Sequence, residues 1–308
     1  MSKPLTLDGY SEQVTKNCER VLVTLLRNLG PHKNSLALVG GLTPRYLVPE
    51  RLPVVAQHAG TLDLDVVIDL VVLEDTEAYR TLEDNLKKIG FERGENDKGQ
   101  KVNWKWKVKM EDGTSIVLEL LADHPDLRGG RAQPLPDKGQ MSALNIPHSS
   151  MVFDHYDTAE VTAELLGGNG LATETIRHAN IVSFTCLKAI AYDDRQERKD
   201  AHDLVYCLEY APQKLDGVSA MFKDALGGKH RDVVLHSLAL LRNRFATDGN
   251  AEGYLKDGPV AVAKFELGED EDTREERALR QREAADVIES FESFFLSSII
   301  DTFPQSGK

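Results

Sequence analysis

The sequence predicts an α/β protein: a mixed sheet flanked by helices, followed by a mainly helical C-terminal part. Three observations support this. Apolar strand patterns alternate with helical patterns in the first half, Asp112-Gly113 marks a hairpin turn, and almost every pattern after residue 171 has a helical period. A glycine-rich run at 167–170 separates the two parts. We therefore expect a sheet domain over 1–166 and a helical domain over 167–308.

Hydrophobic periodicity defines the elements of the first domain. Helices show apolar residues at every third or fourth position and end in glycine, as at Gly30 and Gly90. Strands show short apolar runs or strict alternation. In chain order we expect a helix over 14–29, a strand over 36–39, a helix starting at 43–47, a strand over 63–68, a helix over 76–89, a hairpin of strands 101–109 and 115–121, and strands over 141–146 and 159–165.

A long loop and five helices complete the prediction. The stretch 124–140 holds several Gly and Pro residues, and a loop of this length is a candidate border of a substrate cleft. The residues 258–263 are expected to form an irregular connection. Helical spacing predicts helices over 172–193, 199–210, 215–226, 230–246 and 273–300.

Composition limits the class of protein. The 308 residues are 41% hydrophobic, enough for a full core. No apolar run is long enough to span a bilayer and the N-terminus lacks a signal-peptide pattern, so we expect a cytoplasmic protein without a membrane partner. Cys18, Cys186 and Cys207 are widely spaced, as expected of reduced, buried thiols. The nine histidines show no zinc-type spacing.

The net charge of −13 is unevenly distributed. Residues 266–292 contain 11 acids and four arginines, a net −7, which leaves −6 for the rest of the chain. A basic surface can therefore exist locally. The candidates are 195–199 and the lysine face of 101–109, although alternating lysines also occur on solvated edge strands.

Asp63-Leu64-Asp65 at the start of a predicted strand is the main candidate site. With a two-residue repeat, the two carboxylates project from one face of the strand. Adjacent carboxylates repel each other and are costly to bury unless a cation joins them. Oxygen ligands select Mg²⁺ or Mn²⁺. The alternative is an acidic, solvated strand edge.

A third carboxylate is expected from the hairpin. Glu119 lies among apolar residues on the returning strand, where strand pairing can bring it next to Asp65. Asp123, just past that strand, is the alternative. Glu119 could also be a surface residue on a half-exposed strand.

Gly40-Gly41 is a candidate phosphate-binding turn. It follows an apolar strand and precedes Thr43-Pro44-Arg45, where Thr can cap a helix and Pro fits its first turn. Backbone N–H groups at such a turn can bind phosphate. Glycine pairs also mark ordinary turns.

Together these features resemble the DNA polymerase beta-like nucleotidyltransferase superfamily. The shared pattern is a glycine pair, an acid-x-acid strand and a third acid on a later strand. Here Asp63 follows Gly41 by 22 residues, which implies a small insertion. Lys188 on a predicted helix and Lys199-Asp200-x-x-Asp203-Leu204 resemble the AbiEii/AbiGii-type abortive-infection toxins. Those proteins often carry a basic residue before the first Asp, and His58 or Arg45 is the candidate replacement here.

The resemblance implies a metal-dependent nucleotidyltransferase that acts as the toxin of a toxin–antitoxin system. It implies NTP as substrate, an RNA acceptor such as the 3′ end of tRNA, and a cognate antitoxin. Asp63, Asp65 and Glu119 would hold Mg²⁺. Nucleotide-binding roles would fall to Gly40, Gly41, Thr43, Arg45, Lys188 and Asp200, and a catalytic role also to Lys188 and Asp203. Asp200 and Asp203 could instead be acids that favour a helix N-terminus.

Two other functions compete with this one. An acidic protein suits a cationic acceptor, so a small-molecule nucleotidyltransferase of the antibiotic-modifying type is one alternative. An inactive member of the fold that serves as a binding module is the other, but it would be expected to have lost the acids. Inhibition of translation on expression would separate the toxin from the first alternative, and Mg²⁺–NTP binding would test the second.

Overall fold

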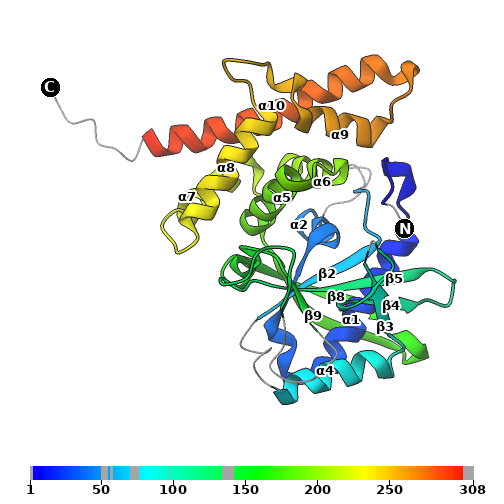
Figure 1. The fold of residues 1–308 in the computed structure, drawn as a ribbon. Coiled ribbons are helices and arrows are strands. Elements are labelled where there is room, and N and C mark those ends of the chain that lie inside the picture. The colour runs from blue at the N-terminus through cyan, green and yellow to red at the C-terminus, as the bar shows by residue number, and fades with distance from the viewer. Residues whose placement is uncertain are drawn as a thin grey trace. The chain divides into compact units, whose positions relative to one another are not determined.

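The computed structural model describes residues 3–49, 55, 58–69, 76–96, 98–133 and 142–300 (Figure 1). Side chains are described except at 31, 32, 76–81 and 296–300. The chain forms two compact units. One, the sheet unit, comprises Tyr10–Tyr46 and Ala59–Asn180; the other, the helical unit, comprises Met1–Gly9, Leu47–His58 and Ile181–Lys308.

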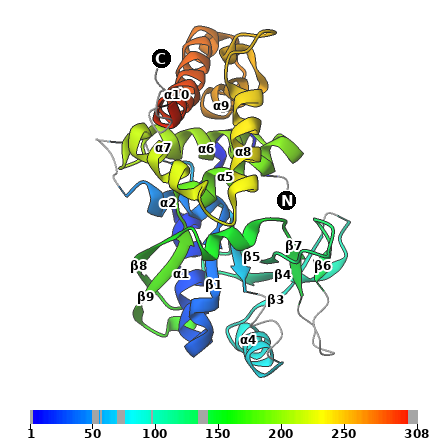
Figure 2. The same ribbon diagram turned by 90° about the vertical axis from the view of Figure 1, so that its left-hand side faces the viewer.

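The sheet unit is built on a nine-stranded mixed sheet, so the predicted α/β class is confirmed. Seven strands run in the order β3-β4-β5-β2-β1-β9-β8, and β7 pairs with β5 and β6 (Figure 2). The strands are β1 (Leu36–Val39), β2 (Asp63–Ile68), β3 (Glu92–Glu95), β4 (Lys101–Lys109), β5 (Ser115–Ala122), β6 (Ala132–Gln133), β7 (Ala143–Asn145), β8 (Tyr156–Glu164) and β9 (Leu171–Ala179).

Two helices pack on one face of this sheet, α1 (Glu12–Leu29) and α4 (Thr76–Lys88) (Figure 1). Ser11 caps α1, its side chain accepting a hydrogen bond from the Gln13 backbone N–H. The cluster beneath them joins the apolar side of α1 to alternate residues of β2, β4 and β5, including Leu64 and Trp106. Short elements complete the unit: η2 (Gly30–Ser35), η3 (Gly40–Leu42), α2 (Pro44–Leu47), η4 (Ser149–Phe153) and η5 (Leu166–Gly168), where η marks a 3₁₀-helix.

The helical unit is held together by an aromatic core. Phe222, Phe245, Phe265 and Phe291 are fully buried. Its elements are η1 (Leu7–Gly9), α5 (Ile181–Arg195), α6 (Arg198–Glu209), α7 (Lys214–Ala225), α8 (Arg231–Phe245), η6 (Gly253–Leu255), α9 (Asp257–Leu267), η7 (Glu271–Thr273) and α10 (Arg274–Ile300).

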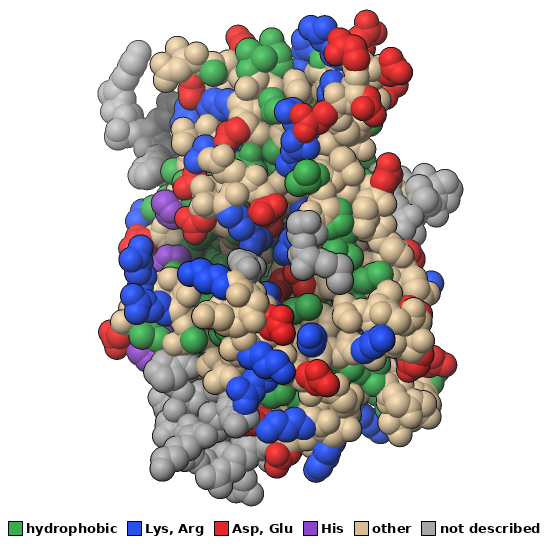
Figure 3. Space-filling model, turned by 45° about the vertical axis from the view of Figure 1, so that its right-hand side comes forward, with side chains coloured by type: hydrophobic (Ala, Val, Ile, Leu, Met, Phe, Trp, Pro, Cys, Tyr) green, Lys and Arg blue, Asp and Glu red, His purple; other side chains and the backbone are tan. Residues whose placement is uncertain are grey.

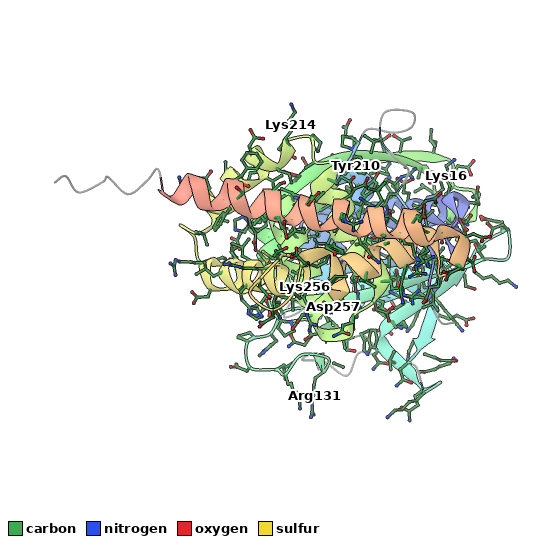
Figure 4. The ribbon with its side chains drawn as sticks, turned by 90° about the horizontal axis from the view of Figure 1, so that it is seen from above. Lys16, Arg131, Tyr210, Lys214, Lys256 and Asp257 are labelled. Carbon is green, nitrogen blue, oxygen red and sulfur yellow. The ribbon has the colours of Figure 1, made fainter. Side chains whose placement is uncertain are left out.

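The connection from α8 to α9 is fixed by ion pairs at the start of α9. Lys256 and Asp257, labelled in Figure 4, bind Asp248 and Arg244 respectively, with N–O distances of 2.7 and 2.8 Å. Acidic side chains, red in Figure 3, gather at the top of that view, where α10 begins. None of the helices in the described ranges has a stretch both long and apolar enough to cross a bilayer.

Two predictions of secondary structure and the predicted domain boundary are wrong. The run 167–170 is the turn of the β8–β9 hairpin rather than a domain boundary, and the predicted helix over 172–193 is strand β9 followed by α5. A glycine-rich run suits a linker between domains and also a tight turn. Here the positive φ values of Gly167, Gly168 and Gly170 allow the tight turn of the hairpin. The division between units therefore falls after Asn180 and not at 166/167. The predicted connection at 258–263 is part of α9, since a proline is tolerated in the first helical turn.

Candidate active site

The acid-x-acid pair lies on the face of β2 that points away from α1. Leu64 and Val66 are buried in the core beneath α1, whereas Asp63 and Asp65 alternate with them and are half-buried. The Thr61 hydroxyl donates to the Asp63 carboxylate over 3.0 Å. The pattern thus places both carboxylates on one face, as predicted from the two-residue repeat.

Glu119 is the neighbour of Asp65 on the adjacent parallel strand. In the β2–β5 pairing Asp65 lies opposite Glu119 and Asp63 opposite Val117. Paired residues on adjacent strands share a face, and their strands are about 4.8 Å apart. Three carboxylates therefore gather within two neighbouring strands, and strand pairing brings Glu119 to the position that the sequence predicted.

Asp123, the alternative third acid, has a different environment. Its carboxylate accepts hydrogen bonds from the backbone N–H of Ser150, over 3.2 Å, and from the Ser150 hydroxyl, over 2.6 Å. These contacts stabilise the start of η4. Asp123 lies four residues beyond Glu119, so the geometry favours Glu119 as the partner of the acid pair.

A cation faces the third carboxylate. Lys105 lies opposite Glu119 in the β4–β5 pairing, and its Nζ is 2.8 Å from Oε1 of Glu119. Both side chains are about one-fifth exposed, at 19% and 20%. The alternation of 101–109 predicted a lysine face, but the pairing of Lys105 with Glu119 was not predicted. The Asp112-Gly113 turn was sufficient to find it, because that turn fixes which residues of β4 and β5 are opposite each other.

Gly40 lies next to Asp65 at the end of β1, the strand that pairs with β2. Val39 lies opposite Asp65 in the β1–β2 pairing, and Gly40 follows with a φ of +72°. A Cβ built on Gly40 would lie 2.1 Å from Oδ2 of Asp65. Glycine is therefore required twice at this position, by the left-handed backbone and by the close approach of the carboxylate.

Other residues assigned to nucleotide binding are engaged within the sheet unit. Arg45 binds Glu19 through Nε, at 2.8 Å, and Glu12 through Nη1, at 3.0 Å. Thr43 is fully buried, and within the described part of the chain its hydroxyl has no hydrogen-bond partner. Gly41 is buried in η3. Gly40, by contrast, lies directly against the Asp65 carboxylate.

The donor set suits a hard divalent cation, but the carboxylates are not preassembled as ligands. Among the described residues, Asp63, Asp65 and Glu119 do not form a group whose ligand atoms all lie within 4.8 Å of one another. The ion pair with Lys105 accounts for part of this, because it engages an oxygen of Glu119. Carboxylate oxygens are the ligands that Mg²⁺ and Mn²⁺ prefer. By the chemistry of their donor atoms, the three carboxylates suit such an ion.

A second cluster, in the helical unit, contains the predicted residues of α5 and α6. Lys188 Nζ lies 2.7 Å from Oδ1 of Asp200 and 2.7 Å from Oδ2 of Asp203. Arg195 also binds Asp200, at 2.6 Å, and Lys199 binds Asp203, at 2.8 Å. Asp203 therefore contacts Lys188 directly and can fix the position of its ammonium group.

Burial and charge act in opposite directions on the pKa values of these groups. Burial alone would raise the pKa of Asp200, but the charges of Lys188 and Arg195 lower it to about 2. The pKa of Asp203 is likewise held well below its usual value, since Lys188 and Lys199 outweigh its burial. Lys188 is thus a cation held between two carboxylates, with its side chain only 9% exposed.

Two histidines extend this cluster. The Nε2 atom of His58 lies 2.8 Å from Oδ1 of Asp203, and burial lowers the pKa of His58 to about 3 despite that carboxylate. His202 stacks on His58 with ring centroids 5.4 Å apart. The sequence analysis gave His202 no role, because no local spacing links it to His58.

The comparisons with known proteins leave the family open. No protein-family model matches the chain, and no curated protein matches it either.

Proposed function

We propose that the protein is a metal-dependent nucleotidyltransferase that moves a nucleoside monophosphate from an NTP to an acceptor hydroxyl. The observation that carries the proposal is the pairing of Asp65 with Glu119 on one face of the sheet, with Asp63 beside them and Gly40 against the Asp65 carboxylate. Three acids with this arrangement in a mixed sheet match the pattern of the nucleotidyltransferase superfamily noted above.

The chemistry is a substitution at the α-phosphorus. The acceptor oxygen forms a bond to the α-phosphorus, the bond from that phosphorus to the β-phosphate oxygen breaks, pyrophosphate leaves, and the hydroxyl proton passes to solvent. Bound Mg²⁺ or Mn²⁺ would lower the pKa of the acceptor hydroxyl and neutralise charge on the triphosphate.

The protein residues hold and orient the reacting groups. Asp63, Asp65 and Glu119 supply the oxygen ligands for the metal. Gly40 leaves room for the Asp65 carboxylate, since any Cβ would displace it. Catalysis of this kind depends on positioning and charge stabilisation more than on covalent participation of the protein.

In the proposal Lys188 supplies a positive charge for phosphate, and Asp203 fixes the position of its ammonium group. The contacts at 2.7 Å give Lys188 a fixed position and a permanent charge, which suits binding of phosphate oxygens. Asp200 holds the same ammonium group from the other side.

The acceptor and biological role follow from the same resemblance. The proposal names the 3′ end of tRNA as acceptor and a cytoplasmic toxin, with a cognate antitoxin, as the role. The three cysteines are free and buried, which is compatible with a reducing compartment.

A labelling experiment tests the activity. Purified full-length protein is incubated with each α-³²P NTP, Mg²⁺ and total bacterial tRNA, and the products are separated on a denaturing gel. We expect one nucleotide to label tRNA with the wild type and not with Asp65→Asn or Glu119→Gln. Glu160→Gln is the matched control, because Glu160 is an exposed acid on β8 of the same sheet.

The outcomes separate the competing functions. Label in a small cationic acceptor but not in tRNA would favour the antibiotic-modifying alternative, which the net charge of −13 supports. No transfer to either acceptor, together with no Mg²⁺–NTP binding in a calorimeter, would refute the proposal. Growth arrest in a host that depends on Asp65 would support the toxin role.

A further inference from the structure

The helical unit contains two histidines that the proposed reaction does not use, and both lie close to Asp203. His58, His202 and Asp203 each offer one ligand atom, and these atoms all lie within 4.8 Å of one another. Among the described residues, no other group of three or more His, Cys, Asp or Glu side chains meets this condition. Two imidazoles and one carboxylate are a common donor set for a transition metal.

The hydrogen bonds of His202 leave one ring nitrogen available. Its Nδ1 lies 2.9 Å from Oε1 of Glu266, so a neutral ring carries its proton on Nδ1. The other nitrogen, Nε2, is buried and has no hydrogen-bond partner among the residues that the structure describes. A buried acceptor without a partner is costly, about 1–3 kcal/mol, and such atoms call for an explanation. A metal ion would supply the missing partner.

Glu266 supports His202 as an outer carboxylate supports a metal ligand. Glu266 is itself fixed by Arg280, with an Nε–Oε2 distance of 2.6 Å, and Arg280 also binds Glu209. Metal-binding histidines usually donate their second N–H to a carboxylate in this way, which fixes the ring and its tautomer. The outer shell of a metal site is therefore already formed.

Asp203 can offer an oxygen without losing both of its lysine partners. Oδ2 accepts from Lys188 and Lys199, at 2.7 and 2.8 Å. Oδ1 faces His58 Nε2 at 2.8 Å and is also 2.8 Å from Lys199. A metal bound to Oδ1 would replace the hydrogen bond from His58 and leave the two contacts on Oδ2 in place.

We propose that His58, His202 and Asp203 form a binding site for a transition-metal ion of the Zn²⁺ class in the helical unit. Nitrogen ligands separate this site from the all-oxygen site proposed on the sheet, so Mg²⁺ should not compete for it. Because His58 is far from α6 in the sequence, the bound ion would tie these two segments together. Its expected role is structural.

The test uses the full-length protein without nucleotide, titrated with Co²⁺ as a visible probe and with Zn²⁺ in a calorimeter. We expect one Co²⁺ per chain with the visible absorption of a nitrogen-bound ion, displaced by Zn²⁺ but not by excess Mg²⁺. His58→Gln and His202→Asn should abolish this signal. His236→Ala is the control, because His236 is an exposed histidine on α8 of the same unit.

A variant of the outer shell distinguishes a built site from incidental binding to histidine. Glu266→Gln should weaken Zn²⁺ binding about 10- to 100-fold, as removal of an outer carboxylate typically does. Asp65→Asn should bind Co²⁺ normally, so failure of the nucleotidyltransferase proposal would leave this result unchanged. Circular dichroism verifies that His58→Gln and His202→Asn are folded. The proposal is refuted if the wild type does not bind one Co²⁺ per chain. It is also refuted if the two folded variants bind Co²⁺ as the wild type does.

Discussion

Replacement of Gly40 by alanine should damage both the stability and the activity of the sheet unit. The φ of +72° is the first reason, because an L-residue in the left-handed region costs about 1–2 kcal/mol. The second reason is steric. The new Cβ would lie 2.1 Å from Oδ2, 2.9 Å from Cγ and 3.0 Å from Cβ of Asp65.

The steric part cannot be relieved by turning the carboxylate alone, since the Asp65 Cβ is fixed to strand β2. Forcing an extra carbon into a packed position typically costs about 1–3 kcal/mol more. We therefore expect Gly40→Ala to lower the free energy of unfolding by about 2–5 kcal/mol. It should also displace the Asp65 carboxylate and abolish nucleotide transfer.

Gly99→Ala is a control that isolates the backbone cost. Gly99 has the same φ of +72°, but a Cβ there would meet no atom within 4 Å. It should lose only about 1–2 kcal/mol and retain activity. Urea unfolding and the tRNA-labelling gel measure both quantities. Equal stability of the two variants, with full transfer by Gly40→Ala, would show that Gly40 does not pack against Asp65 as described.

Three further predictions concern the charged clusters. Lys188→Met leaves two buried carboxylates without their shared cation, so urea unfolding should show a loss of about 3–5 kcal/mol; a loss below 1 kcal/mol would contradict this. The pKa of Asp200 is about 2 in the folded protein, below its unfolded value. The ionised carboxylate therefore contributes about 2 kcal/mol to the free energy of unfolding above pH 4, and this contribution is lost as pH falls through 2. The stability of Asp200→Asn, measured by acid titration, should lack this dependence on pH. Lys105→Met should change the free energy of unfolding by less than about 1 kcal/mol, because a partly exposed ion pair contributes little. The same variant should bind Mg²⁺ more tightly in calorimetry, because Glu119 no longer pairs with a lysine. Unchanged binding would exclude competition between Lys105 and the metal.

Local patterns determined most of the fold. Residue periodicity located α1, β2 and the β4–β5 hairpin, because alternation and helical spacing reflect which side of an element is buried. The same alternation placed Asp63 and Asp65 on one face of a strand. A hairpin pairs residues that are close in the sequence, so the Lys105–Glu119 contact could also have been predicted from the sequence.

Glycine-rich and proline-containing segments were harder to predict, because one composition serves several structures. The run at 167–170 suits a hairpin turn as well as a linker, and Pro259 suits both a loop and the first turn of α9. In these cases the pairing of β8 with β9 and the packing of α9 against α10 decide the outcome.

By itself, the sequence determined the fold class and identified the acids proposed to bind a divalent cation, since both depend on local spacing. Only the tertiary structure decided which acid joins Asp65, that Gly40 lies against its carboxylate, and that His58 meets His202. Those contacts join residues distant in the chain. Strand order and helix packing bring such residues together, and no local pattern records that arrangement.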